Sequence, residues 1–166
     1  MPQSFIRVVL HTTFGTKYRR PLILPEIEQA LHQVLDAKLR DMDCRVYKIG
    51  GAMDHVHLLH GLPRSHRISD VLREVKARSS CWMRDHGYPD FKWQTGYACH
   101  SADYRDRSVL ERYIANQKAH HYGSVAAYLE KASRTQVRRT FEDEYRTLLD
   151  ELDLMYEEKY LFAEKG

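Results

Sequence analysis

The chain has 166 residues, of which 43% are hydrophobic and 30% are charged. This length suits one compact domain with room for a terminal extension, and the composition argues against global disorder. No apolar run approaches the roughly 20 residues that a membrane-spanning helix needs, and the apolar opening, interrupted by Arg7, is too short for a secretory signal. Three widely spaced cysteines argue against a disulfide framework or a zinc ribbon, so we expect a reducing, cytoplasmic setting.

The net charge of +3 hides an uneven distribution along the chain. Residues 1–141 hold 23 Lys and Arg against 14 Asp and Glu, a balance of +9, whereas residues 142–166 hold 3 against 9, a balance of −6. A body this basic favours an anionic partner, most commonly a nucleic acid. Charge alone leaves open an ordinary charged surface.

Hydrophobic periodicity predicts strands and helices in alternation over the first half of the chain. Residues 5–13 are apolar and β-branched, as is typical of a strand. Apolar residues at helical spacing then predict a helix from Pro25 to about Leu39, with the proline suited to a helix start. Residues 44–50 and 53–62 are predicted to form two strands that turn at Gly50-Gly51.

The second half continues the pattern with a helix from Ile68 to about His86. Short strands are predicted at Phe91–Gln94 and Tyr97–Ala102, and a third helix over about Asp106–His121. The order β-α-β-β-α-β followed by a helix is that of an α+β, ferredoxin-like sandwich. We expect an antiparallel sheet with helices on one face and the third helix, which bears Tyr113, near the opposite face.

The remaining residues are predicted to form a C-terminal helical extension. We expect residues 1–121 to form the main domain and residues 122–166 to pack on the same domain or on a partner. Residues 122–140 are basic and are predicted to be helical in part, and an acidic segment follows them. Five apolar residues of that segment recur at helical spacing and need a surface to pack against: Phe141, Tyr145, Leu148, Leu149 and Leu152.

A pair of histidines lies in the middle of the predicted strand 53–62. Side chains alternate across a strand, so His55 and His57 share one face while Val56 and Leu58 share the other. If helices cover the apolar face, the opposite face offers two imidazoles close enough to hold one ion. The chain has 10 histidines, so a chance pair with a purely structural role stays open.

A second candidate group lies on the third predicted helix. Gln117 follows Tyr113 by four residues and His120 follows it by seven, so one helix face carries all three. Leu110 and Ile114 point elsewhere and can bury the helix. The spacing alone leaves open a plain surface pair of phenol and amide.

Together these features give a family resemblance. The sequence resembles the single-tyrosine HUH transposases of bacterial and archaeal insertion sequences (IS200-like transposases), in which two histidines flank a bulky apolar residue. Several separated motifs carry the resemblance, in order, through nearly the whole chain: His11–Pro21, Gly51–Leu59 around the histidine pair, Trp93–Tyr97, and Tyr113–Gln117 followed by His120-His121. The departure is at the end, where residues 122–140 separate these histidines from a Phe-acid-rich segment, Phe141–Tyr145, that usually follows sooner.

The resemblance implies a chemistry. It implies that single-stranded DNA is cleaved and rejoined through a 5′-phosphotyrosine on Tyr113, with a free 3′-hydroxyl left behind. It further implies that His55, His57 and Gln117 bind Mg²⁺ or Mn²⁺. A tyrosine of ordinary pKa, about 10, attacks poorly unless the phosphate is activated, and a cation held by neutral donors keeps its full charge for that purpose.

The implied partner is single-stranded DNA with hairpin ends, and the implied assembly is a homodimer without a membrane. In such a dimer the tyrosine helix of one chain can complete the histidine pair of the other, with residues 103–106 as the hinge. We expect two basic clusters to contact phosphates: Lys17, Arg19 and Arg20, then Arg73, Lys76 and Arg78 with Arg84. Core or base-stacking roles stay open for three aromatic residues: Trp82, Trp93 and Tyr97.

Other polar residues near the motifs are not expected to bind the metal ion. Asp54 could orient a neighbour or end the hairpin, and His60 falls on the strand face away from His57. His120 and His121 are expected at a helix end, with contact to the scissile phosphate as the alternative. The insertion could add DNA contacts through Arg134, Arg138 and Arg139.

Three alternative functions remain. One is another HUH class, although replication initiators typically carry lysine where Gln117 stands, and relaxases usually put the tyrosine before the histidine pair. A second is a domesticated DNA-binding relative with a host role. The third is a zinc hydrolase, which no further cluster of ligand residues at suitable spacing supports.

Overall fold

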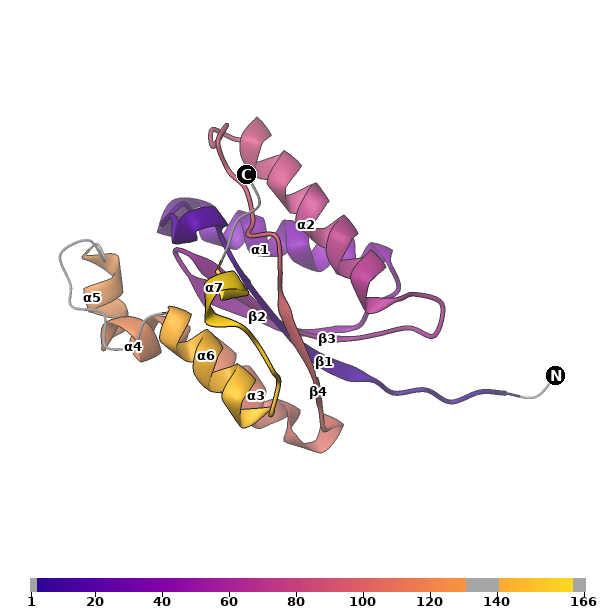
Figure 1. Ribbon diagram of the computed structural model, residues 1–166. Coiled ribbons are helices and arrows are strands. Elements are labelled where there is room, and N and C mark those ends of the chain that lie inside the picture. Colours follow the sequence, from indigo (N-terminus) through magenta and orange to yellow (C-terminus); the bar gives the residue numbers. More distant parts are fainter. Residues whose placement is uncertain (1–2, 131–140, 163–166) are drawn as a thin grey trace.

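The computed structural model describes residues 3–130 and 141–162, and a four-stranded sheet lies at its centre (Figure 1). The strands are β1 (Val9–Gly15), β2 (Val46–Ala52), β3 (His55–Gly61) and β4 (Ala98–Ala102), in the order β2-β3-β1-β4. All neighbouring pairs are antiparallel. Helix α1 (Pro25–Asp41) connects β1 to β2, and α2 (Ile68–Asp85) connects β3 to β4. This arrangement confirms the predicted ferredoxin-like sandwich.

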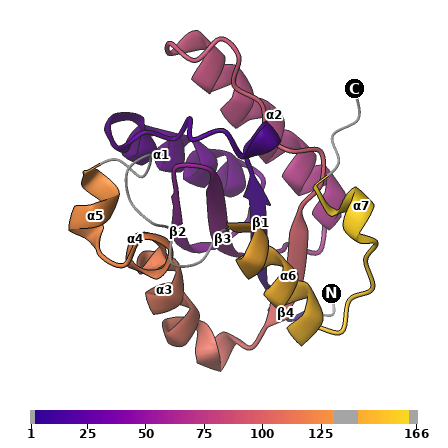
Figure 2. The ribbon, with the colours of Figure 1, turned by 60° about the vertical axis from the view of Figure 1, so that its left-hand side comes forward.

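Helices α1 and α2 lie together on one face of the sheet (Figures 1 and 2). On α1 the side chains of Leu31, Leu35 and Leu39 recur every four residues and are buried, which explains why this segment docks as a helix. The main core fills the layer between these helices and the sheet: Phe14, Leu31, Leu35, Val56, Leu58, Val71 and Val75. Removal of these side chains from water is the principal force that fixes this face.

Three other helices cover the opposite face: α3 (Arg107–Ala115), α4 (Gln117–Tyr122) and α6 (Phe141–Glu151). In Figure 2, α3 and α4 lie toward β2 and α6 lies toward β4. Helix α6 packs on its own chain, since Phe141, Tyr145 and Leu149 are buried with Ala98 of β4. The helix with Tyr113 therefore lies where it was predicted, on the face away from α1 and α2.

Short elements complete the described chain. These are the 3₁₀ turns η1 (Lys17–Arg19) and η2 (Tyr104–Asp106) and the helices α5 (Val125–Leu129) and α7 (Glu158–Leu161). Arg134, Arg138 and Arg139, which were expected to add DNA contacts, lie outside the described residues. Within the ranges 3–130 and 141–162, no helix has the length and apolar character to cross a membrane.

The predicted turn at Gly50-Gly51 is wrong, because both glycines belong to β2. The chain turns instead at Met53 and Asp54. A Cβ on Gly50 would lie 2.5 Å from the carbonyl oxygen of Ile114, and one on Gly51 would lie 2.2 Å from the carbonyl oxygen of His55. These positions need glycine because α3 and the returning strand approach the backbone closely, not because the chain reverses there.

Three other boundaries differ from prediction. Strand β1 begins at Val9 because both partner strands end opposite that residue. Phe91–Gln94 forms no strand, and only Trp93 makes an isolated bridge, to Thr16. The third helix breaks at Asn116 into α3 and α4.

Candidate active site

The histidine pair faces the helices that cover the second face of the sheet. His55 and His57 are fully buried on that side, whereas Val56 and Leu58 enter the core under α1 and α2, as strand alternation predicts. His60 points to the core side, as predicted, and its Nε2 lies 2.9 Å from the hydroxyl of Thr12. His60 is therefore separated from the pair by the sheet.

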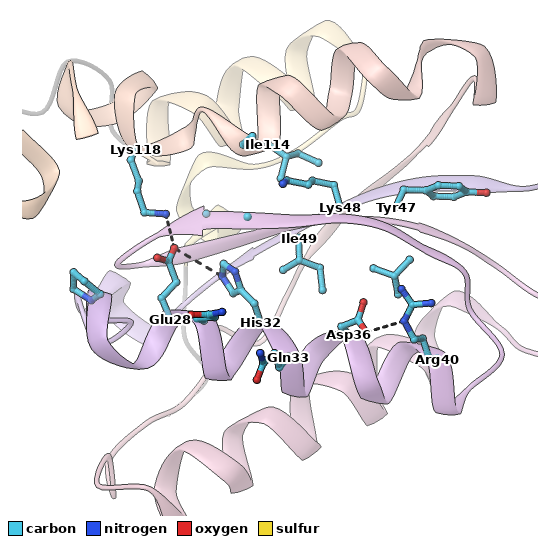
Figure 3. A pocket seen from close by; sticks show the side chains of 16 residues that line it. Glu28, His32, Gln33, Asp36, Arg40, Tyr47, Lys48, Ile49, Ile114 and Lys118 are labelled. Carbon is cyan, nitrogen blue, oxygen red and sulfur yellow. Dashed lines mark hydrogen bonds and ion pairs between the residues drawn. The ribbon is translucent and has the colours of Figure 1, made fainter. Parts of the chain in front are cut away.

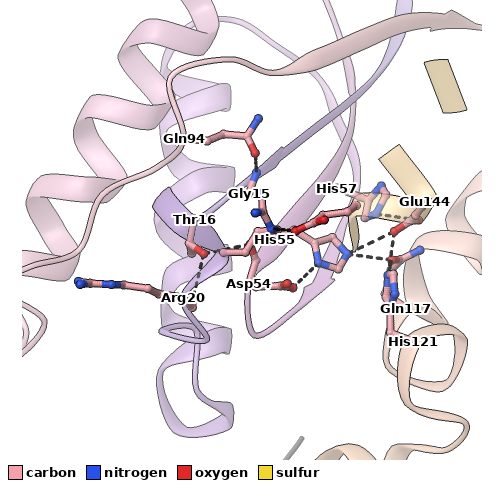
Figure 4. Close-up of polar contacts among 12 residues, drawn as sticks. Gly15, Thr16, Arg20, Asp54, His55, His57, Gln94, Gln117, His121 and Glu144 are labelled. Atoms are coloured by element: carbon pink, nitrogen blue, oxygen red, sulfur yellow. Dashed lines mark hydrogen bonds and ion pairs between the residues drawn. The ribbon is translucent and has the colours of Figure 1, made fainter. Parts of the chain in front are cut away.

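His55 is oriented from both of its ring nitrogens (Figure 4). Its Nδ1 donates to the Asp54 carboxylate at 2.7 Å, and its Nε2 lies 3.0 Å from Oε1 of Gln117. The ring also stacks on Phe141 of α6, with 4.5 Å between centroids. Burial lowers the pKa of His55, but the hydrogen bond and charge of Asp54, together with Glu144 and Gln117, outweigh it, so the pKa lies above its ordinary value. Asp54 thus orients a neighbour, which was one of its two expected roles.

His57 is oriented from β1. Its Nδ1 lies 2.9 Å from Nε2 of His11 and 3.0 Å from the hydroxyl of Thr13, which directs Nε2 toward Glu144. Burial holds the pKa of His57 below its ordinary value although Glu144 acts to raise it. Burial, with help from His57 and His100, lowers the pKa of His11 to about 2. His11 was not predicted as a site residue, since its only signal was membership of the first motif.

The break between α3 and α4 brings Tyr113 and Gln117 to the histidine pair. The ring centroids of Tyr113 and His57 lie 5.6 Å apart. Oε1 of Gln117 lies 3.0 Å from both His55 and His121, and its amide nitrogen donates to the Tyr113 carbonyl at the break. The four residues named by the resemblance therefore lie side by side within one chain.

Two further residues complete this cluster, and the sequence reasoning did not assign them to it. Nε2 of His121 lies 2.8 Å from Oε2 of Glu144, and the hydroxyl of Tyr113 donates to Oε1 of the same carboxylate. A signal existed for both: His121 follows Gln117 by four residues, and Glu144 lies between Phe141 and Tyr145 on the apolar stripe of α6. We call these six residues the central cluster: His55, His57, Tyr113, Gln117, His121 and Glu144.

The central cluster has the donor set of a divalent cation site. One ligand atom from each of His55, His121 and Glu144 lies within 4.8 Å of the others. Nε2 of His57 and the carboxylate of Glu144 are buried and face each other, with 3.3 Å between Nε2 and Oε1. Burial alone would raise the pKa of Glu144, but the nearby His121 and His57 hold it well below its ordinary value. Imidazole nitrogens with carboxylate and amide oxygens suit Mn²⁺ well and Mg²⁺ less well.

The residues predicted to contact DNA do not form one surface at this site. Arg19 pairs with Glu142 of α6, next to the central cluster. Arg73 and Lys76 lie on α2, on the other face of the sheet. Arg73 pairs with Asp70, and the Lys76 ammonium donates to three backbone carbonyls of residues 94–96.

The aromatic residues considered for base stacking have different surroundings. Trp93 is buried and donates to Ser79, which makes it a core residue. Trp82 stacks on His86, while Arg78 and Trp82 both line a cavity between α1 and α2. Tyr97 is 36% exposed.

A separate cavity of about 730 Å³ lies along the free edge of β2, between α1 and the break after α3 (Figure 3). Two ion pairs lie in its lining: Glu28 accepts from Lys118 at 2.6 Å, and Asp36 accepts from Arg40 at 2.7 Å. Glu144 and the histidine pair do not line it.

Comparison with known proteins identifies the family of this chain and its fold. The family model described as "Transposase IS200 like" matches residues 4–117. A protein from Deinococcus radiodurans R1 that has been assigned as a transposase shares 22% identity, with 70% of this chain and 98% of that chain covered and a TM-score of 0.57. A REP-associated tyrosine transposase, solved bound to a REP hairpin, shares 20% identity over 73% of each chain, with a TM-score of 0.55. No curated protein matches the chain.

Proposed function

Since the chain belongs to the family of IS200-like transposases, we propose that it cleaves and rejoins single-stranded DNA through a bond between Tyr113 and a 5′ phosphate. The observation that carries the proposal is the meeting of Tyr113 with His55 and His57 inside one chain, with 5.6 Å between the rings of Tyr113 and His57. A phenol next to a buried set of cation ligands is the arrangement that this chemistry needs.

Cleavage of this kind exchanges one phosphate ester for another. The phenolic oxygen of Tyr113 bonds to phosphorus and loses its proton, while the bond between phosphorus and the 3′ oxygen breaks and that oxygen takes up a proton. Rejoining is the reverse step, in which a 3′-hydroxyl attacks the phosphotyrosine. The ester bond is conserved throughout, so no nucleoside triphosphate is consumed.

We propose His55, His57 and Gln117 as ligands of Mg²⁺ or Mn²⁺. When bound, the cation would polarise the scissile phosphate and stabilise the departing 3′ oxygen. Asp54 holds the His55 ring and His11 holds the His57 ring, and such outer partners fix ligand orientation.

The substrate in this proposal is single-stranded DNA with hairpin ends, because one structural relative was solved with a hairpin. Lys17, Arg20 and Lys92 line a cavity of about 550 Å³ beside the exposed Tyr18, which suits contact with phosphates and an unpaired base. We also propose a cytoplasmic location, where free thiols stay reduced. A homodimer is part of the same proposal.

The test is a covalent adduct between the protein and a single-stranded oligonucleotide that carries the element's end. We expect an adduct on denaturing gels with Mn²⁺ or Mg²⁺, none with chelator, and none for Tyr113→Phe, which should still bind the DNA. His57→Ala should lower the yield at least roughly 10–100-fold, the range seen even when outer partners of a metal ligand are lost.

Matched controls come from the same chain. Tyr97→Phe and Tyr104→Phe remove phenols from other positions of the chain, and His60→Ala removes a histidine from the opposite face of β3. All three variants should form the adduct. Adduct formation by Tyr113→Phe would refute the nucleophile assignment. Cleavage without rejoining would indicate a nicking endonuclease, and hairpin binding without any adduct would indicate a domesticated DNA-binding relative.

A further inference from the structure

Glu144 is an unusual carboxylate in this fold. In the described part of the chain it is the one acidic residue that is buried, with 3% of its surface exposed. Helix α6 holds it there by packing Phe141, Tyr145 and Leu149 on the sheet. Burial of a charge is costly unless partners compensate it, so the partners of Glu144 indicate what it is placed to do.

The two carboxylate oxygens face different groups. Oε1 accepts from the Tyr113 hydroxyl and lies 3.3 Å from Nε2 of His57. Oε2 is buried and lies 2.8 Å from Nε2 of His121 and 3.7 Å from Nε2 of His55. Oε1 therefore accepts the hydrogen bond of the phenol, and Oε2 points at imidazole nitrogens, which are themselves good cation ligands.

We propose that Glu144 is a cation ligand through Oε2, with His121 as a further ligand, so that helix α6 completes the metal site. This inference rests on the proposed function and adds two ligands to His55, His57 and Gln117. Mg²⁺ and Mn²⁺ prefer oxygen donors, and among the buried groups of the central cluster only Glu144 supplies an anionic oxygen.

The same carboxylate would link the cation to the nucleophile. An ionised carboxylate has about four lone-pair positions, so Oε2 can bind the cation while Oε1 still accepts from Tyr113. Glu144 then keeps the phenol beside the cation until a phosphate replaces this contact. In this role Glu144 positions Tyr113 and does not need to remove its proton.

The experiment measures Mn²⁺ binding by the full chain, without DNA, by titration calorimetry and by the electron spin resonance signal of free Mn²⁺. Glu144→Gln keeps the shape of the side chain and removes its charge, and we expect its Kd for Mn²⁺ to rise at least about tenfold. Asp143→Asn is the matched control: it removes one carboxylate from the same turn of α6, with 60% of that side chain exposed, and should stay within about twofold of the wild type.

Two further measurements distinguish the loss of a metal ligand from a loss of folding. Co²⁺ substituted for Mn²⁺ should give a visible absorption spectrum that changes in Glu144→Gln and His121→Ala but not in Asp143→Asn. If Glu144→Gln melts far below the wild type without metal, Glu144→Asp replaces it, because that side chain keeps the charge but is one methylene shorter. It should bind Mn²⁺ more weakly than the wild type.

The result that overturns the inference is an unchanged Mn²⁺ affinity and an unchanged Co²⁺ spectrum in Glu144→Gln. Higher DNA cleavage by that variant at unchanged affinity would also overturn it, since α6 would then obstruct the site. Either result leaves the proposed function intact if His55→Ala still abolishes Mn²⁺ binding. Failure of the wild type to bind any divalent cation would instead refute the metal site itself.

Discussion

His32 shows how a buried histidine outside the central cluster makes the stability of the fold sensitive to acid. It lies on α1 beside the cavity at the edge of β2, with its side chain 19% exposed. Burial first, then the charges of Lys118 and Lys48, lower its pKa to about 4. Below about pH 6.5, His32 is protonated in the unfolded chain but stays neutral in the folded chain, so acid favours unfolding.

We therefore expect the free energy of unfolding to fall between pH 7 and pH 5, with about 1–2 kcal/mol of that loss due to His32. The window follows from the two pKa values: the loss begins near the unfolded value of about 6.5 and ends near the folded value of about 4. In urea unfolding at both pH values, His32→Gln should lose that much less stability than the wild type. His86→Gln changes an exposed histidine at the end of α2 and is the control, with a loss expected to equal that of the wild type. Equal losses in all three proteins would refute the assignment to His32.

At the scale of elements, the docking of α3 on β2 decides where Tyr113 lies. Gly50 is the contact point, because a Cβ there would lie 2.5 Å from the carbonyl oxygen of Ile114 and 2.7 Å from its Cγ2. The prediction is that Gly50→Ala lowers the free energy of unfolding by about 1–3 kcal/mol, as overpacking typically does, and reduces adduct formation by Tyr113 because α3 must shift.

The control for this change is another strand glycine. A Cβ on Gly61 of β3 would lie 3.5 Å from its nearest neighbours, which is ordinary contact. Gly61→Ala should therefore leave both stability and adduct yield near the wild type in the same urea and gel measurements. Equal effects of the two alanines would mean that strand propensity, and not the approach of α3, explains the result.

The same glycine shows where sequence reasoning succeeds and fails. Helices α1 and α2 and the alternation around His55 were predictable because apolar periodicity is a local property of the chain. Gly50-Gly51 was misread because a turn and a close helix crossing both require glycine, and only the tertiary arrangement distinguishes them. The sequence pattern therefore predicts which segments form helices and strands better than it predicts which of them come into contact.

The central cluster follows the same rule. His55, His57, Tyr113 and Gln117 came from motif order, and the structure brings these four together. Glu144 was missed because its position depends on how α6 docks on the sheet. No local sequence pattern predicts that α6 returns to the helix that carries Tyr113. The division into residues 1–121 and an extension stays a prediction, and α6 reaches across it to the sheet.

At the scale of the whole molecule, the question is whether one chain or two form an active site. Tyr113 and the histidine pair meet within a single chain here. The segment predicted as a hinge is the turn η2, where the guanidinium groups of Arg7 and Arg107 each lie 4.0 Å from the Tyr104 ring. A swing of α3 to a partner would have to break these contacts as well as the one between Tyr113 and Glu144.

We therefore expect cleavage in cis. A mixture of Tyr113→Phe chains with chains that carry both His55→Ala and His57→Ala should form no adduct, because neither chain has a complete site. Wild-type chains mixed with either variant should form adduct in proportion to the wild-type fraction. Adduct in the mixture of the two variants would show that α3 exchanges between chains, since only a dimer that shares its tyrosines could then assemble a phenol with an intact histidine pair.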